Sequence, residues 1–552
     1  MVTPAERIRP TFAKATVGKR AVPVMLAIVA AALYFYRLND TPMFVGGDEA
    51  FFAINSRSIA TTARDLDGRL MPLFFRIDAH TWYQPVLVYL MAISFTIAQV
   101  SEWTLRAPTA LIGVIDVLLV YAIGLRLFRH RGYAALAAAM LAIAPAHLIL
   151  ARQALDYVCP LPFVLGWLWC VVKAIDDDDV YAALGAGLLL GVGFYSYVAS
   201  WILMPIYFVV TLVTMRLTGC RGRLLLAATA GFLLPFTLLL LWMRYEPATI
   251  AAIVSRYGFS DASEGTTLLQ SVRGLLHYYV IQMRLSLYWS YFDPVFLFLA
   301  GSPNVTLSTG KAGVFLATAI VLLPVGIYDI LRRCDRSLVL LAGFLTTPLA
   351  PVLINTGHAI QRELAVVVFG VLISAYGARR LLSSPTAPVR IVATVMLIAM
   401  PAQFAYFAAD YFGAYRSRSA NWIDPINFDA VARDVLDRDA VSTVPRIYLS
   451  EALDDVEARW RFYLAKYQRE DLWQRTWIVD GPVRNAWSIN ARLLPAPLTE
   501  TEAPAGSVFV VGAANPNLPA LTRDGGCCHV VREINGATGE PTVFVVEQTQ
   551  RR

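Results

Sequence analysis

Residues 21–36 read AVPVMLAIVAAALYFY, and this uncharged stretch decides the class of fold. Its length approaches the roughly 20 apolar residues that a helix needs to cross the hydrocarbon core of a bilayer. Five basic residues precede it: Arg7, Arg9, Lys14, Lys19 and Arg20. A signal peptide would show the same order of charged and apolar residues. Because many more apolar runs follow, we expect an uncleaved first membrane helix with a cytoplasmic N-terminus.

Composition extends this interpretation to the whole chain. Of the 552 residues, 57% are hydrophobic and only 16% are charged. Soluble proteins carry about a quarter charged residues, so too few are present to cover several soluble domains. A cytosolic enzyme, a secreted disulfide scaffold and a disordered protein are therefore excluded. The net charge of +7 favours cytoplasmic anchoring charges over a nucleic-acid partner.

Further apolar runs predict ten more membrane helices, which makes eleven in all. They cover residues 108–126, 133–150, 158–174, 180–197, 200–216, 224–243, 312–331, 337–355, 364–378 and 389–409. The 15-residue segment 86–100 is short for a crossing helix and suits a helix at the membrane interface. If it does not cross, the basic turns near residues 129, 221, 333 and 380 all lie on the cytoplasmic side, as positive charges usually do.

This topology divides the chain into three parts: a cytoplasmic N-terminus (1–20), a membrane domain (21–409) and an outer, periplasmic C-terminal domain (410–552). Large outer loops are expected at about 37–107 and 244–311. Beyond residue 410 the apolar runs shorten to strand length and alternate with helical stretches. This pattern predicts a small α/β domain. The predicted strands are 446–449, 477–479, 508–511 and 543–546, and the predicted helices are 428–436 and 454–466.

Two adjacent acids follow the first span, in the segment Gly46-Gly47-Asp48-Glu49-Ala50-Phe51-Phe52. The two glycines permit a tight turn that would direct both carboxylates toward the membrane face. The structural alternative is that Asp48 caps a helix covering residues 49–60. Asp116 lies inside a predicted span, where a charge is costly, and the sequence names no partner for it.

A second group of polar residues lies at the outer ends of later spans. Arg152 and Asp156 are four residues apart, so they could form a simple ion pair on one helix face. Basic residues are scattered over the outer loops, where they could be solvated, contact lipid headgroups or converge on a phosphate. They are Arg57, Arg76, His80, Arg273, Arg284, Lys311, His358 and Arg362. The triplet Asp65-Leu66-Asp67 has a metal-binding form that any chain of this length contains by chance.

The order of these landmarks resembles that of the GT-C membrane glycosyltransferases. The resemblance is to the bacterial branch related to protein O-mannosyltransferases, the lipid A aminoarabinose transferase and the RgtA/B/C/D-like sugar transferases. It covers about residues 20–415 and rests on segments that keep their order along the chain. These are Gly47–Ala50, Tyr83–Leu90, Glu102–Pro108, Pro145–Asp156, Asp293–Phe298 followed by Gly310 and Gly313, and His358–Arg362.

The resemblance implies a GT-C fold and transfer of a sugar from a polyprenyl-phosphate donor on the periplasmic face of the inner membrane. Asp48 would be the base that accepts the proton of the acceptor hydroxyl, with inversion at the anomeric carbon. Glu49, the second acid of the catalytic pair, would help to orient the acceptor or sugar together with Asp156 and Tyr83. The lipid phosphate would be bound by some of Arg57, Arg76, His80, Arg152, Arg273, His358 and Arg362.

The same resemblance sets the expected partners: the lipid-linked donor, the bilayer, and an acceptor glycan, lipid or protein, without nucleic acid. Because polyprenyl phosphate is a good leaving group, we expect no metal and no cofactor. Gln84 departs from the family, in which many members have proline there, and no lysine lies beside it. A transporter or flippase of a lipid-linked intermediate is the alternative. It predicts charges along several spans and helices broken near the middle of the membrane.

Overall fold

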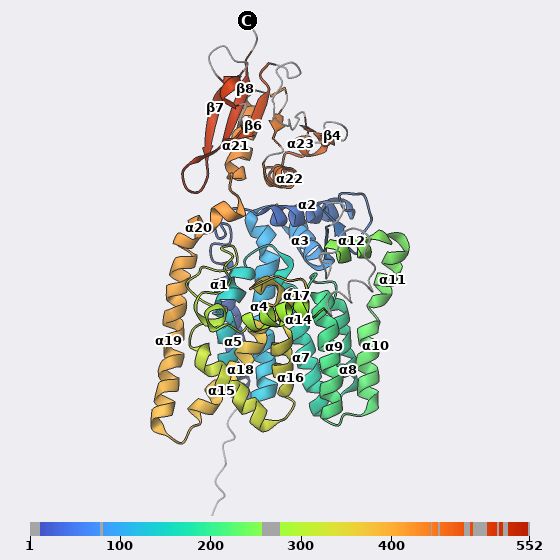
Figure 1. Cartoon of the computed structure of the whole chain (residues 1–552), viewed down its shortest axis with the longest axis vertical. Coiled ribbons are helices and arrows are strands. Elements are labelled where there is room, and N and C mark those ends of the chain that lie inside the picture. Colours follow the sequence, from blue (N-terminus) through green and yellow to red (C-terminus); the bar gives the residue numbers. More distant parts are fainter. Residues whose placement is uncertain are drawn as a thin grey trace, which may run out of the picture.

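A computed structural model shows a helical bundle that carries a smaller lobe at one end (Figure 1). The structure describes residues 12–77, 81–256, 277–442, 444–445, 447–450, 453–479, 486–489, 505–515, 518–522 and 528–549. The bundle runs from α1 to α19, and the C-terminal lobe follows α19. The chain is thus a polytopic helical protein with a small C-terminal mixed sheet.

The bundle helices coincide with the apolar runs of the sequence. Their bounds are α1 Phe12–Phe35, α4 Glu102–Phe128, α5 Arg131–Ala142, α6 Pro145–Leu150, α7 Pro160–Asp177, α8 Val180–Gly193, α9 Ser200–Leu217, α10 Gly222–Leu233, α11 Phe236–Tyr245, α15 Ala319–Arg333, α16 Leu338–Thr346, α17 Leu349–Leu353, α18 Ala365–Leu382 and α19 Ala387–Tyr411. Six described helical segments are long and apolar enough to cross a membrane. Each of the eleven predicted spans falls on a helix or on consecutive helices.

The predicted span 312–331 begins too early. α15 starts only at Ala319, because the preceding residues extend beside the short π-helical turn η2, Val295–Leu299. There the N–H groups of Val314 and Phe315 donate to the carbonyl oxygens of Phe296 and Leu297, at 3.2 and 2.8 Å. These backbone groups cannot also close the first turn of a helix, so the apolar run is divided between a loop and α15.

Two helices lie across the end of the bundle that faces the lobe, α2 (Gly47–Thr62) and α3 (Pro85–Ile97) (Figure 1). α3 covers most of the segment that was expected not to cross. It has 13 residues and a proline in its first turn, and it ends before the Ser101 cap of α4. Between α2 and α3 a small antiparallel pair, β1 (Phe75–Arg76) and β2 (Trp82–Tyr83), places Phe75 opposite Tyr83.

The basic turns gather at the opposite end of the bundle, away from the lobe. Arg336 forms an ion pair with Asp176, Arg126 with Asp177 at 3.2 Å, and Arg380 with Asp329 at 3.2 Å. These pairs connect α7, α4, α15 and α18 with the turn before α16. The acidic run after α7 therefore neutralises part of the basic end.

The lobe contains the helices that follow α19 and one six-stranded mixed sheet, in the order β4-β5-β3-β6-β8-β7. β3 and β6 are parallel and the other neighbours are antiparallel. The elements are α20 Ala414–Ile423, α21 Phe428–Val441, β3 Ile447–Leu449, α22 Val456–Lys466, α23 Glu470–Arg475, β4 Thr476–Val479, β5 Ala486–Ile489, β6 Val508–Gly512, α24 Leu518–Thr522, β7 Cys528–Asn535 and β8 Pro541–Gln548. The four strands and two helices predicted from the sequence are present. β5 and β7 were missed because neither is a continuous apolar run.

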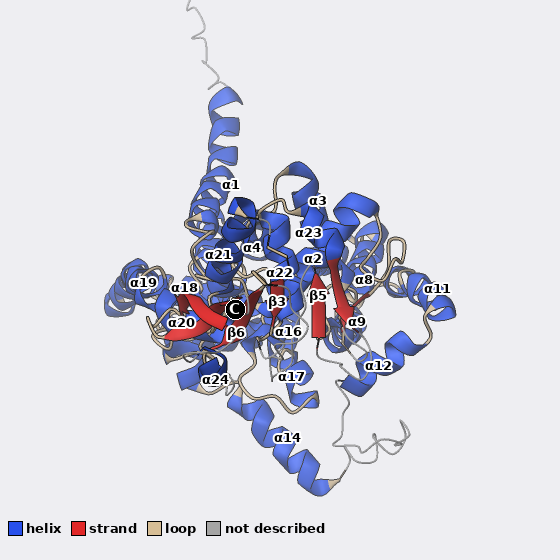
Figure 2. Cartoon of the chain, turned by 90° about the horizontal axis from the view of Figure 1, so that it is seen from above, coloured by secondary structure: helices blue, strands red, loops and turns tan. Residues whose placement is uncertain are grey.

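Charged side chains attach the lobe to the bundle, and α22 lies over α2 in both views (Figures 1 and 2). Lys466 contacts Glu102 at the start of α4 at 2.5 Å. Arg459, only 2% exposed, donates to the carbonyl oxygen of Val45 at 2.8 Å. Because Val45 precedes α2, the lobe is fixed directly to the segment that carries Asp48.

The interior of the bundle contains a buried polar cluster around Asp116, the acid that the sequence left without a partner. Asp116 on α4 has His147 of α6 as its partner, with Nε2 and Oδ2 3.2 Å apart, and His147 Nδ1 is 2.7 Å from the Tyr34 hydroxyl of α1. All three side chains are fully buried. They join three helices, as expected for a polar residue that is satisfied inside a membrane protein.

Candidate active site

The first turn of α2 gives its two acids different surroundings. Glu49 Oε2 accepts the N–H of Gly46 at 3.0 Å, so Glu49 closes this turn and Asp48 does not act as the cap. Glu49 also accepts two hydrogen bonds from Arg106, both at 3.1 Å, and one from the Ala154 N–H at 2.7 Å. Only 3% of Glu49 is exposed. Its carboxylate is therefore occupied by protein donors, and this geometry suits positioning rather than proton transfer.

Asp48 is exposed, and Oδ1 accepts a hydrogen bond from the hydroxyl of Tyr83. The ring of Tyr83 stacks on Phe52 of α2 with centroids 4.2 Å apart. Burial raises the pKa of Tyr83 well above its usual value, and the nearby charge of Asp48 adds to this effect. Tyr83 consequently stays protonated and donates to Asp48, which holds one carboxylate oxygen in place and leaves the other accessible.

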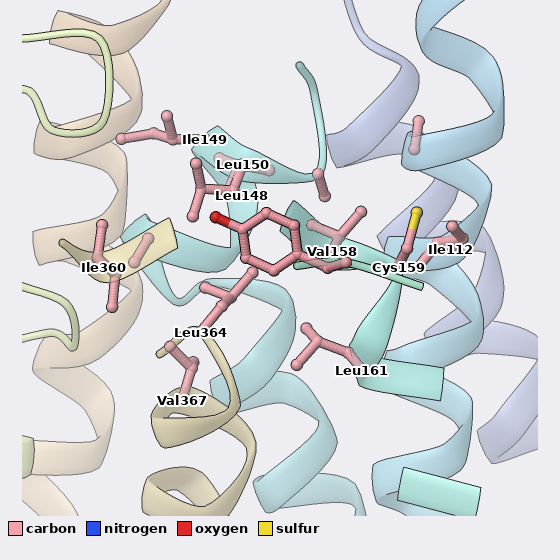
Figure 3. Packing of buried hydrophobic residues seen from close by; sticks show 14 of the residues in the cluster. Ile112, Leu148, Ile149, Leu150, Val158, Cys159, Leu161, Ile360, Leu364 and Val367 are labelled. Atoms are coloured by element: carbon pink, nitrogen blue, oxygen red, sulfur yellow. The ribbon is translucent and has the colours of Figure 1, made fainter. Parts of the chain in front are cut away.

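Asp156 begins the short turn η1 (Asp156–Val158) and is 6% exposed. The Asp156 carboxyl group interacts electrostatically with both Asp48 and Arg362. Arg362 lies after α17, in the turn η3 (Ile360–Arg362). Residues next to Asp156 and Arg362, among them Val158, Ile360 and Leu364, point into one apolar cluster (Figure 3). This packing holds the carboxylates and the cation in one neighbourhood.

Arg152 neither pairs with Asp156 nor points to a phosphate site. The chain leaves helix α6 at Ala151, so Arg152 and Asp156 do not share a helix face. The buried guanidinium donates to four carbonyl oxygens at and beyond the end of α1, those of Leu33, Tyr34, Arg37 and Thr41. These bonds satisfy carbonyl groups left unpaired at a helix end. Arg152 therefore anchors α1 and is not directed at a lipid phosphate.

A cavity of about 380 Å³ opens beside Asp48, between the bundle and the lobe. We call it the acidic cavity. Its described lining consists of Pro42, Gly46, Gly47, Asp48, Glu49, Gln153, Leu155, Tyr157, Asn304, Thr306, Leu307, Trp422, Ile423, Asp454, Asp455 and Arg459. Leu155 and Tyr157, the two sequence neighbours of Asp156, are among these residues. The cavity is large enough for a polar group to approach Asp48 from outside.

A second, narrow cavity of about 70 Å³ has an almost entirely apolar lining, and we call it the apolar groove. It is lined by Val198, Ala199, Trp201, Ile202, Ile253, Val254, Ala350, Ile354 and Arg362, from the chain before and within α9, from α12 (Ala248–Arg256), and from α17 and the turn after it. Arg362 is the only charged residue in this described lining. A small apolar lining with one guanidinium suits the phosphate-bearing end of a lipid.

Two other predicted phosphate ligands, Arg57 and Arg76, form contacts elsewhere in the described part of the chain. Arg57 pairs with Glu470 and lies over the ring of Trp473, so it belongs to the contact between α2 and α23. Arg76 donates twice to Asp67, at 3.0 and 2.9 Å. Asp65 and Asp67 also bind Arg69, which occupies the carboxylates of the triplet with metal-binding form. His80 and Arg273 lie outside the described residues.

His358 lies in a third cavity, with Asp293 and Arg418, and its Nε2 is 3.2 Å from the carbonyl oxygen of Ser290 on α14 (Tyr278–Ser290). His358 and Arg362 are thus near in sequence but line different cavities. The structure brings together Asp48, Tyr83, Asp156 and Arg362, and it places Arg57, Arg76 and Arg152 in structural contacts.

Three acids near these cavities were not anticipated. Asp454 and Asp455 of the lobe line the acidic cavity. Glu363, next to Arg362, is fully buried, and neither carboxylate oxygen has a hydrogen-bond partner among the described residues. Burial raises the pKa of Glu363 well above its usual value, which favours the protonated form of this carboxyl group. The only sequence signal for Asp454 and Asp455 was their place at the start of a predicted helix.

Residues 80–242 match the family model described as dolichyl-phosphate-mannose-protein mannosyltransferase. A comparison with curated protein sequences gives no match. Two crystal structures of ArnT from Cupriavidus metallidurans have a similar fold. The apo form is 14% identical with a TM-score of 0.58, and the match covers 98% of this chain and 100% of that one. The form bound to undecaprenyl phosphate is 15% identical with a TM-score of 0.57, covering 97% and 98%.

These findings confirm the resemblance that the sequence landmarks predicted. Residues 80–242 are therefore similar to the mannosyltransferase family of that model. The fold of nearly the whole chain is similar to that of ArnT.

Proposed function

We propose that this protein transfers a sugar from a polyprenyl-phosphate donor to an acceptor hydroxyl on the periplasmic face of the cell inner membrane. One observation supports this proposal above the others. The exposed carboxylate of Asp48, held by Tyr83, lines the acidic cavity, and Arg362, which lines the apolar groove, acts with Asp48 on the same buried Asp156. The ArnT structure bound to undecaprenyl phosphate shows that a relative in fold takes a lipid phosphate.

The proposed reaction uses the two regions together. The acceptor oxygen attacks the anomeric carbon and its proton passes to Asp48, while the bond from that carbon to the phosphate oxygen breaks on the opposite side. The configuration is therefore inverted, and the lipid phosphate leaves with the bonding electron pair. A positioned carboxylate base contributes about 10²–10⁴-fold to such a step. Arg362 would stabilise the charge that develops on the leaving phosphate.

Asp156, buried between Asp48 and Arg362, would orient the reacting groups. Tyr83 would keep Asp48 in the orientation that accepts the proton. Glu49 would maintain the turn that presents Asp48, because its own oxygens are bonded to Gly46, Arg106 and Ala154. This assigns Glu49 a supporting part rather than a second catalytic role.

The test is Asp48→Asn in purified full-length protein supplied with a panel of undecaprenyl-phosphate sugars and a membrane extract as acceptor source. We expect sugar transfer to fall by about 10²–10⁴-fold. Release of undecaprenyl phosphate measures the reaction whichever molecule in the extract is the acceptor. Wild-type rates in a folded Asp48→Asn protein would contradict the mechanism. Asp67→Asn, which removes an outer-loop acid away from the cavity, is the matched control.

A further inference from the structure

We propose that the acidic cavity is the acceptor subsite and that it binds an uncharged or cationic saccharide, with Trp422 of the lobe as the surface on which the sugar ring stacks. This inference rests on the proposed function and adds the chemical class of the acceptor. It assigns to the C-terminal lobe a direct part in binding, through Trp422, Asp454 and Asp455.

The position of Trp422 is the first observation. It lies near the end of α20 and lines the cavity, yet 71% of it is exposed. A large aromatic side chain that stays exposed in a concave polar site commonly marks a binding surface, because its flat apolar face gains from being covered. Sugar rings offer a flat face of C–H groups together with a rim of hydroxyls. Asn304 and Gln153 in the same lining can bind such hydroxyls.

Charge is the second observation. Asp48, Asp454 and Asp455 all line the cavity. The only cation in the described lining is Arg459, which forms an ion pair with Asp424 at 3.2 Å and donates to the carbonyl oxygens of Val45 and Ile423 at 2.8 and 3.0 Å. Arg459 is therefore already occupied. A phosphate on the acceptor would meet carboxylates without a free cation, whereas hydroxyl or ammonium groups would find acceptors.

The third observation is that the lobe lies close to Asp48, the proposed catalytic base. Asp455 lies against Gly47, the residue before Asp48, and a Cβ atom on Gly47 would collide with Oδ2 of Asp455. Partial burial raises the pKa of Asp455, and the charges of Asp454 and Asp48 add to this effect while Arg459 opposes it. The three acids line one cavity. Glycine at position 47 thus allows a carboxylate of the lobe to reach the start of α2. A sugar bound by the lobe would have a hydroxyl beside Asp48.

Tryptophan fluorescence of the detergent-purified full chain tests this inference without an enzymatic assay. The probes are methyl β-D-glucoside, glucosamine and glucose 6-phosphate, titrated at equal ionic strength and at neutral pH. We expect glucosamine to bind most tightly and glucose 6-phosphate most weakly, and Trp422→Phe to remove the fluorescence change. In the double variant Asp454→Asn/Asp455→Asn the preference for the cationic over the anionic probe should fall about tenfold.

Glu540→Gln, an exposed acid in the turn between β7 and β8, is the matched control and should leave the preference unchanged. Tight binding of glucose 6-phosphate by the wild type, or a fluorescence change that persists in Trp422→Phe, would overturn the inference. Failure of the proposed function would give a different result from failure of this inference. In that case Asp48→Asn would transfer sugar at the wild-type rate, while the three probes would still bind in the expected order.

Discussion

The acidic cavity and the apolar groove differ in almost every physical property. The cavity is wide, open to the outside and rich in carboxylates, with its one described cation already paired. The groove is small and apolar, and Arg362 is the one charged residue in its described lining. This difference is the one that the proposed function requires, with a polar acceptor in the cavity and a lipid phosphate at the groove.

The largest expected effect concerns the side of the membrane on which both regions open. After replacement of the native cysteines by serine, a cysteine introduced by Glu540→Cys in the lobe should react with a membrane-impermeant maleimide added to intact cells. A cysteine introduced by Arg129→Cys at the basic end of the bundle should react only after the membrane is opened. Labelling of residue 129 from outside would reverse the topology and place the acidic cavity in the cytoplasm.

A smaller effect should separate the two adjacent acids of α2. Glu49→Ala leaves the fully buried Arg106 without its carboxylate partner. Loss of one partner of a buried ion pair costs about 3–5 kcal/mol of stability. We expect thermal unfolding in detergent to show this loss. Asp48→Asn should change stability by less than about 1 kcal/mol, because Asp48 is exposed. Equal effects of the two variants would remove the distinction between the base and its support.

The smallest effect in this series concerns the groove. Arg362→Gln removes the only charge in its described lining, so the dissociation constant for undecaprenyl phosphate should rise about 10–100-fold. Binding of this lipid to the purified protein measures the effect without any sugar. Arg64→Gln, at an exposed arginine of the first outer loop, is the control and should bind as the wild type does. Unchanged binding in Arg362→Gln would move the phosphate site away from the groove.

Much of the architecture could be predicted from the sequence because membrane helices are set by local composition. The apolar runs located the helices, and the short run 86–100 corresponds to α3, which lies across the end of the bundle. The order of landmarks along the chain also gave the enzyme class. The prediction failed where part of an apolar run forms a loop instead of a helix. This occurs at residues 312–318, where backbone N–H groups donate to carbonyl oxygens of η2.

The site was predicted less completely. Asp48, Tyr83, Asp156 and Arg362 were all singled out, but so were cations that the structure assigns to ion pairs or helix ends, such as Arg76 and Arg152. Sequence spacing shows that a basic residue lies in an outer loop, and it does not show what that residue contacts. Glu363, Asp454 and Asp455 were missed for the same reason.

The sequence by itself determined that this chain is a helical membrane protein with a small α/β lobe and an acid pair soon after its first apolar helix. These properties follow from hydrophobicity and local turn chemistry, which act over a few residues. Only the tertiary structure decided that Glu49 would be bonded on all sides while Asp48 stayed exposed, and that Asp455 would lie against Gly47. Such contacts join residues far apart in the chain, and they depend on how the helices and the lobe pack.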